Sequence, residues 1–260
     1  MAKVLLDIQP QRVAVISFND PESLNAMSET MATDFRAVVE TLRPKAKDLS
    51  AIILTGAGRA FSAGGDLKML DGKRAISGEA NRLLMLGFYD SFLSLRELSV
   101  PLIAAINGAA VGAGLCVASA CDMRIAATGA KLGFTFVRLG LHPGMGATYF
   151  LPRVIGHAHA AELLLTGRVI DADYALRIGL VSKVVAPDQV LAEAQLIAAE
   201  LNEGGPEAIR QLLESIRTPQ ATLEQALQRE ALCQAVNYRG EEFAEGVKAV
   251  MEKRKANFRK

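Results

Sequence analysis

The chain has 260 residues, of which 50% are hydrophobic and 22% are charged, and its formal net charge is +1 at pH 7. A chain of this length can bury a sizeable core, but so small a net charge gives no long-range attraction for nucleic acid or an anionic membrane. We therefore expect small-molecule ligands, with any anionic ligand held by local groups.

The cysteines and the amino-terminal residues indicate the cellular compartment in which the protein is expected. Cys116, Cys121 and Cys233 form no C-x-x-C pair and are too few for a disulfide framework. The first apolar run ends at Asp7 after three residues, which is too short for the core of a signal peptide. Residues 100–121 carry no charge, but proline, asparagine and several glycines interrupt them, which favours a buried strand, turn and helix over a membrane span. We expect free thiols and a cytoplasmic protein.

The first third of the chain predicts a hairpin, a helix and a strand. Residues 4–8 and 13–18 are rich in β-formers and are followed by turn residues. Ser28 can cap a helix that runs to about Leu42, because apolar residues recur there at helical spacing. Residues 51–55 predict the next strand.

The middle of the chain repeats the pattern of strand, loop and helix. We predict an amphipathic helix over residues 79–98, a strand over 102–106, a helix from Gly112 and a strand over 123–127. This alternation is typical of an α/β layer structure.

The last part of the chain is mainly helical. It predicts short helices over residues 147–155, 159–165 and 171–178, a short strand over 181–185, and helices only from Asp188 onward. We expect an α/β core over residues 1–187 that contains the functional site. Residues 188–260 form a helical region that packs on this core or on a neighbouring subunit.

Two glycine-bearing segments, residues 61–68 (FSAGGDLK) and 107–114 (NGAAVGAG), carry most information about function. Glycine lets the backbone adopt positive φ and approach a ligand closely, and the start of a helix presents N–H groups without intrahelical acceptors. A plain turn for the first segment and close helix packing for the second are the simpler interpretations. Neither segment matches a nucleotide-binding fingerprint. Together they can direct two backbone N–H groups at one oxyanion.

The order and spacing of these segments resemble the crotonase superfamily, also called the enoyl-CoA hydratase/isomerase family, over nearly the whole chain. The resemblance implies an α/β crotonase (ClpP-like) spiral of ββα units with a helical C-terminal trimerisation region, as a homotrimer or a dimer of trimers. Further matching pieces are residues 24–26 (LNA), 120–124 (ACDMR), 143–146 (PGMG), 164–167 (LLTG), 175–181 (ALRIGLV) and 252–258 (EKRKANF).

The resemblance also implies site residues. In the family, two peptide N–H groups bind the thioester oxygen and stabilise an enolate, and by position they fall on Gly65 and Ala113. A C-terminal basic residue, often from a neighbouring subunit, corresponds to Lys253. The implied coenzyme A contacts are Ala26, Ala63, Gly65, Asp66, Leu67, Lys68 and Lys253. The simpler interpretations are solvated lysines and, for Asp66, bonds to loop backbone. Coenzyme A enters as part of the substrate, and no metal or redox cofactor is implied.

At two positions the sequence departs from the pattern of the family's hydratases. Hydratases of this family use two glutamates to orient and deprotonate water, and by register their positions hold Cys116 and Phe136 here. Burial raises the pKa of a thiol, so Cys116 is a poor base and a small core residue, and Phe136 does not titrate. His142 lies in a loop where other crotonase-like enzymes place acids or bases, and it can move a proton near neutral pH; a loop histidine bonded to backbone is the alternative. Tyr149 is a further candidate donor.

We therefore predict an acyl-CoA enzyme that stabilises an enolate in a backbone oxyanion hole. Its nominal activity is that of an enoyl-CoA hydratase/isomerase, a lyase or isomerase of fatty acid metabolism. Because the glutamates are absent, an acyl-CoA decarboxylase, a thioester hydrolase and a non-catalytic acyl-CoA-binding protein are alternative interpretations. An RNA-binding or interaction protein on this scaffold is disfavoured by the near-neutral charge.

Overall fold

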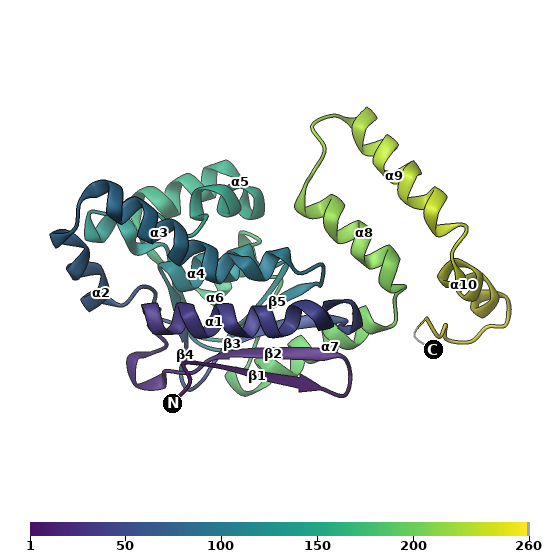
Figure 1. The fold of residues 1–260 in the computed structure, drawn as a ribbon, viewed down its shortest axis with the longest axis horizontal. Helices are drawn as coiled ribbons and strands as arrows, with labels where there is room; N and C mark the ends of the chain where they lie inside the picture. Colours follow the sequence, from purple (N-terminus) through teal and green to yellow (C-terminus); the bar gives the residue numbers. More distant parts are fainter. Residues whose placement is uncertain (259–260) are drawn as a thin grey trace.

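The computed structural model describes residues 1–258 and shows an α/β core from which three C-terminal helices extend as an arm (Figure 1). The core contains a six-stranded sheet in which β1 and β2 form an antiparallel hairpin and the remaining neighbours are parallel. Its strands are, in sheet order, β1 (Val4–Gln9), β2 (Val13–Phe18), β3 (Ala51–Gly56), β5 (Leu102–Ile106), β7 (Met123–Ala127) and β10 (Lys183–Val185). The predicted hairpin and the predicted strands of this sheet are confirmed.

A second sheet was not predicted. It has four strands, three of them parallel, in the order β4-β6-β8-β9. Each strand has three residues, which is too short for a hydrophobic period to be recognised. The strands are β4 (Ala60–Ser62), β6 (Ala109–Val111), β8 (Lys131–Gly133) and β9 (Val169–Asp171).

The helices of the core largely follow the sequence prediction. The Ser28 hydroxyl caps α1 by accepting from the Met31 N–H at 3.2 Å. The two helices predicted over 147–155 and 159–165 occur as the two parts of α5, which is interrupted at Gly156, where φ is 75° and ψ is 163°. The α-helices of the core are α1 (Glu29–Leu42), α2 (Leu67–Gly72), α3 (Gly78–Leu93), α4 (Ala113–Ala120), α5 (Ala147–Thr166), α6 (Ala172–Arg177) and α7 (Val190–Asn202). Short 3₁₀ helices occur between them, and one of these, η5 (Thr135–Leu139), contributes to the site.

The helical region expected over residues 188–260 begins with a helix, α7, that packs on the core. It contacts β3, β5 and β7 and buries Val190, Ala194 and Ala198. It belongs to the core because its apolar face covers an otherwise open face of a sheet whose central strands are buried. The change from core to arm follows Asn202, and the last two residues of the predicted 188–260 region lie outside the described residues.

The arm consists of α8 (Pro206–Arg217), α9 (Leu223–Asn237) and α10 (Glu241–Met251). Arg217 ties its first helix to the core, because its guanidinium donates to both oxygens of Asp122, at 2.9 and 2.7 Å, and to three backbone carbonyls of residues 96–100. Side chains 217 and 122 are only 10% and 13% exposed, so this ion pair is largely shielded from water. Helix α9, in contrast, has no buried residue.

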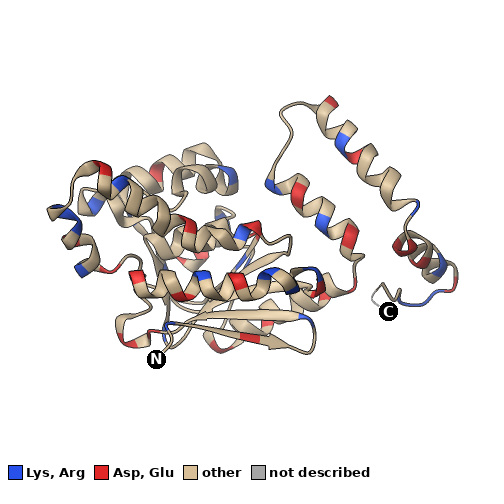
Figure 2. Ribbon diagram, viewed as in Figure 1, with Lys and Arg blue, Asp and Glu red and all other residues tan. Residues whose placement is uncertain are grey.

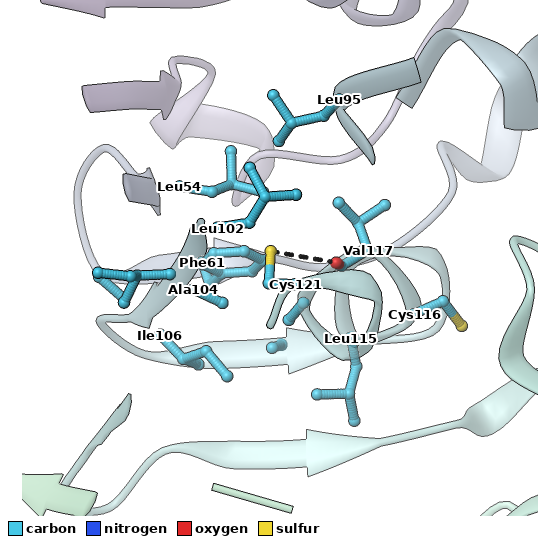
Figure 3. Close-up of a cluster of buried hydrophobic side chains, with 14 of the residues drawn as sticks. Leu54, Phe61, Leu95, Leu102, Ala104, Ile106, Leu115, Cys116, Val117 and Cys121 are labelled. Atoms are coloured by element: carbon cyan, nitrogen blue, oxygen red, sulfur yellow. Dashed lines mark hydrogen bonds between the residues drawn. The ribbon is translucent and has the colours of Figure 1, made fainter. Parts of the chain in front are cut away.

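The interior of the core is closely packed around α4, all of whose residues are buried. Figure 3 shows Leu115 and Val117 among the side chains of strand β5, and the Cys121 thiol 3.6 Å from the Val117 carbonyl. The three cysteines are free thiols, as predicted.

Charge is mixed over the surface. In Figure 2, both α1 and α8 carry basic as well as acidic residues. Within residues 1–258, no helix is both long enough and apolar enough to cross a membrane.

Candidate active site

The second sheet brings the two glycine-bearing segments together. Strand β4 pairs in parallel with β6, so the residues that follow each strand leave the sheet at the same edge. At Gly64, φ is 91°, and a Cβ there would lie 2.7 Å from the Val111 carbonyl oxygen and 3.5 Å from the Ala113 nitrogen. Only glycine allows the first loop to approach the second this closely.

Two asparagines hold these loops in place. Asn25 is fully buried, and its amide donates to the carbonyls of Ala57 and Ala60 at 2.9 and 2.8 Å. Asn107 donates to the carbonyl of Gly56 at 2.8 Å, which ties the second segment to the chain that leads into the first. Neither role was predicted from the sequence, although Asn25 lies in the matching piece 24–26.

The predicted oxyanion donors, Gly65 and Ala113, line the same cavity of about 730 Å³. Ala113 is the first residue of α4, so its N–H has no intrahelical acceptor. On either side of Gly65, the chain forms a β-bridge with Met27: the Met27 N–H donates to the Gly64 carbonyl, and the Asp66 N–H donates to the Met27 carbonyl. The Gly65 N–H takes no part in this β-bridge. Within residues 1–258, neither N–H has an acceptor. The cavity can therefore offer two backbone donors to a ligand.

Most of the predicted contacts line this cavity as well. Asp66 also caps α2, since its Oδ1 accepts from the Met69 N–H at 2.7 Å, so the simpler interpretation of this residue as a backbone partner is confirmed. Lys68 is exposed and has no ion pair within the described chain. The predicted residues on the cavity wall are Ala26, Ala63, Gly65, Asp66, Leu67, Lys68, Ala113, Phe136 and His142.

Lys253 is not among the residues that line the cavity. It follows α10 at the end of the arm, with φ of 53°, and its side chain is exposed. The structure of one chain therefore does not bring Lys253 to the site, and a contact from a neighbouring subunit stays a prediction.

The two positions predicted to replace glutamates carry no usable base. Cys116 is 0% exposed, and burial raises the pKa of its thiol, so the thiol stays protonated at neutral pH. Its role as a core cysteine is confirmed, and Figure 3 shows its side chain pointing away from Cys121. Phe136, in η5, is partly buried and forms an apolar part of the cavity wall.

His142 lies exposed on the cavity wall and bonds to backbone at the same time. Its Nδ1 is 2.7 Å from the Pro143 carbonyl oxygen. Because a carbonyl only accepts, Nδ1 carries the hydrogen, and the neutral ring keeps a lone pair on Nε2. The two interpretations of this histidine are thus compatible: one nitrogen is held by the loop and the other can exchange a proton.

The tyrosine that lines the cavity is Tyr89, and not the predicted candidate donor Tyr149. Tyr149 is 47% exposed and lines a different hollow with Arg96 and Phe150. Tyr89, on α3, lines the cavity instead, and burial raises the pKa of its phenol. No sequence signal indicates that Tyr89 lines the cavity, because the face that α3 turns to the cavity depends on how the helix packs.

No cluster of three or more potential metal ligands occurs among the described residues.

Comparison with known proteins identifies the family of the chain. The family model for enoyl-CoA hydratase/isomerase matches residues 9–260. The chain is 43% identical over 195 residues to a Mycobacterium tuberculosis protein named probable enoyl-CoA hydratase, a match that covers 75% of this chain and 74% of that protein. It is 36% identical over 250 residues to a crotonyl-CoA hydratase of Syntrophomonas wolfei, covering 95% of both.

Solved structures show the same fold. An enoyl-CoA hydratase from Bacillus anthracis superposes with a TM-score of 0.91 at 34% identity, covering 98% of both chains. An enoyl-CoA hydratase from a Polaromonas species also gives a TM-score of 0.91, at 30% identity, and covers 98% of this chain and 99% of its own. The predicted crotonase fold is confirmed, and the chain belongs to the enoyl-CoA hydratase/isomerase family of the crotonase superfamily.

Proposed function

We propose that this family member is an acyl-CoA enzyme in which the N–H groups of Gly65 and Ala113 bind the thioester carbonyl oxygen and stabilise an enolate. One observation carries the proposal: Gly65 and Ala113, from separate loops, line one cavity, and neither N–H has an acceptor within the described chain. Each such donor contributes roughly 10²–10³ in rate, because it acts on charge that develops in the transition state.

The charges around the cavity support an anionic ligand such as coenzyme A. Lys68, Lys73 and Arg138 line it, whereas Asp66 is the one carboxylate on the wall among residues 1–258, and that carboxylate is engaged as a helix cap. We propose that the first loop contacts coenzyme A, which enters as part of the substrate, and that a neighbouring subunit supplies Lys253. The proposed contacts in this chain are Ala26, Ala63, Gly65, Asp66, Leu67 and Lys68.

The side chains restrict which reactions the activated thioester can undergo. Orienting and deprotonating a water requires a positioned base, and neither Cys116 nor Phe136 provides one. We propose that efficient hydration of a simple 2-enoyl-CoA is not the main reaction, and that His142 moves a proton through Nε2. The shortage of free carboxylates favours decarboxylation as a second candidate, because loss of CO₂ forms an enolate without a base.

The arm supports an oligomer. Along α9, Leu223, Leu227, Leu232 and Val236 are between 53% and 74% exposed, and so many exposed apolar side chains are costly in water. We propose that these side chains are buried against neighbouring subunits in a homotrimer or a dimer of trimers. Sedimentation velocity tests it, and a monomer at micromolar concentration would refute the assembly.

The function is tested by incubating the protein with a panel of acyl-CoA thioesters in deuterated water. α-Deuterium incorporation and product mass are recorded by mass spectrometry, and binding by calorimetry. We expect deuterium at the α-carbon of at least one thioester. Binding without exchange or product would identify a non-catalytic acyl-CoA binder, and no binding of any thioester would remove the proposal altogether.

A further inference from the structure

Tyr89 lines the cavity, and its hydroxyl has no hydrogen-bond partner among the described residues. Its ring packs against the core from α3, beside Met85 and Phe88, which also line the cavity. A Cβ built on Gly144 would lie only 2.3 Å from the Tyr89 oxygen, so the phenol sits directly against the backbone of that loop. Tyr89 is partly buried, and buried phenol groups usually have a hydrogen-bond partner, so the hydroxyl can still form a bond with a ligand.

The hydroxyl lies near the part of α4 that follows the proposed oxyanion donor. Tyr89 interacts electrostatically with Cys116, which is one helical turn beyond Ala113. Burial, and to a smaller degree the nearby thiol, raises the pKa of the phenol. The phenol is therefore neutral at pH 7 and suited to donating a proton, and unsuited to removing one.

The other titratable groups on the wall are less suited to protonate a bound acyl group. Asp66 caps α2, Lys73 pairs with Glu29 at 2.9 Å, and Lys68 and Arg138 are exposed cations. His142 is exposed and holds its Nδ1 hydrogen against the Pro143 carbonyl. Of the titratable groups on the cavity wall in the described chain, Tyr89 is the proton donor that lies among apolar side chains.

We propose that Tyr89 is the catalytic proton donor to the α-carbon of the thioester enolate, and that the substrate is an acyl-CoA with a carboxylate on that carbon. This inference rests on the proposed oxyanion hole. The bond between the α-carbon and the carboxylate breaks, CO₂ leaves, and the electron pair forms an enolate held by Gly65 and Ala113. The α-carbon then takes the proton from the Tyr89 hydroxyl as the carbonyl reforms, and the tyrosinate recovers a proton from water.

The apolar wall is consistent with this reaction. Losing CO₂ converts a charged carboxylate into a neutral molecule, and an apolar surface such as that of Phe136 and Phe88 disfavours the charged form. The negative charge moves to the thioester oxygen, where the two amides are. A base is not required at any step, which agrees with the lack of a free carboxylate on the described wall.

The test uses malonyl-CoA and methylmalonyl-CoA as probes in deuterated water, with wild type, Tyr89→Phe and Gly144→Ala. We expect wild type to release CO₂ and to give propionyl-CoA with deuterium in one configuration. Tyr89→Phe should lower turnover roughly 10²-fold with binding changed less than about threefold, and its product should be racemic because solvent protonates the enolate. Gly144→Ala should show the same loss by displacing the phenol. Tyr149→Phe, which alters a tyrosine outside the cavity, is the matched control.

Each outcome bears on a different claim. Wild-type rate and configuration in Tyr89→Phe would overturn the role of Tyr89. Failure of wild type to decarboxylate either probe, while α-exchange occurs in other thioesters, would overturn the substrate class and leave the proposed function intact. Absence of both binding and exchange with every thioester would remove the proposed function itself. Thermal unfolding of each variant shows whether a loss of activity reflects a loss of folding.

Discussion

The two ends of the cavity are built in different ways. At one end, two backbone N–H groups are fixed by the pairing of β4 with β6 and by the start of α4. At the other end, side chains of α3, η5 and the loop that carries His142 form the wall. A side-chain substitution changes the second end easily, whereas it leaves the N–H groups of the first in place. If the two N–H groups activate a thioester as proposed, this activation does not depend on the side chains that a particular reaction needs.

The backbone end gives the largest expected effect. Ala113→Pro removes one proposed donor, and proline fits the first position of a helix, where the N–H has no intrahelical acceptor. We expect α-deuterium exchange or turnover to fall by about 10²–10³-fold. Steady-state kinetics and mass spectrometry measure the effect.

The control for this variant is Ala113→Gly, which keeps the N–H and removes only the methyl group. It should retain turnover within about tenfold, with thermal unfolding recorded for both proteins. Equal activity of the proline and glycine variants would show that the Ala113 N–H does not bind the oxyanion, and the contrast between the two ends would disappear.

At the side-chain end, His142→Ala tests the proton transfer proposed for Nε2. We expect α-proton exchange of a saturated acyl-CoA to fall roughly 10²-fold, since a positioned acid or base contributes 10²–10⁴, with calorimetric affinity nearly unchanged. His159→Ala alters another exposed histidine and should behave as wild type. Unchanged exchange in His142→Ala would end the assignment.

The smallest expected effect is a gain of hydratase activity. Phe136→Glu places a carboxylate on the wall at a position that corresponds to one of the two glutamates of the family's hydratases, and we expect hydration of crotonyl-CoA to rise by about tenfold. The gain is limited because the new carboxylate meets an apolar wall that raises its pKa. Phe136→Gln has similar size without the charge, and equal hydration by the two variants would show that the carboxylate does no chemistry there.

Local sequence signals predicted much of the fold. Strand residues 13–18 and the helix capped by Ser28 occur as expected, because β-formers, helical spacing and capping act over a few neighbouring residues. The second sheet was not predicted, and the sequence did not decide whether the helices beyond residue 187 pack on the core, as α7 does, or on a neighbouring subunit. Both depend on which surface a segment meets after the chain has folded, and the sequence pattern is the same for either packing.

The site divides in the same way. The sequence by itself determined that Gly65 and Ala113 are in glycine-bearing turns and that positions 116 and 136 hold no carboxylate. Only the tertiary structure decided that these turns meet, because three-residue strands far apart in the chain have no local signal and are stabilised by pairing with each other. It also decided that Tyr89, and not Tyr149, faces the cavity, since the orientation of a helix is set by the packing of its apolar side chains.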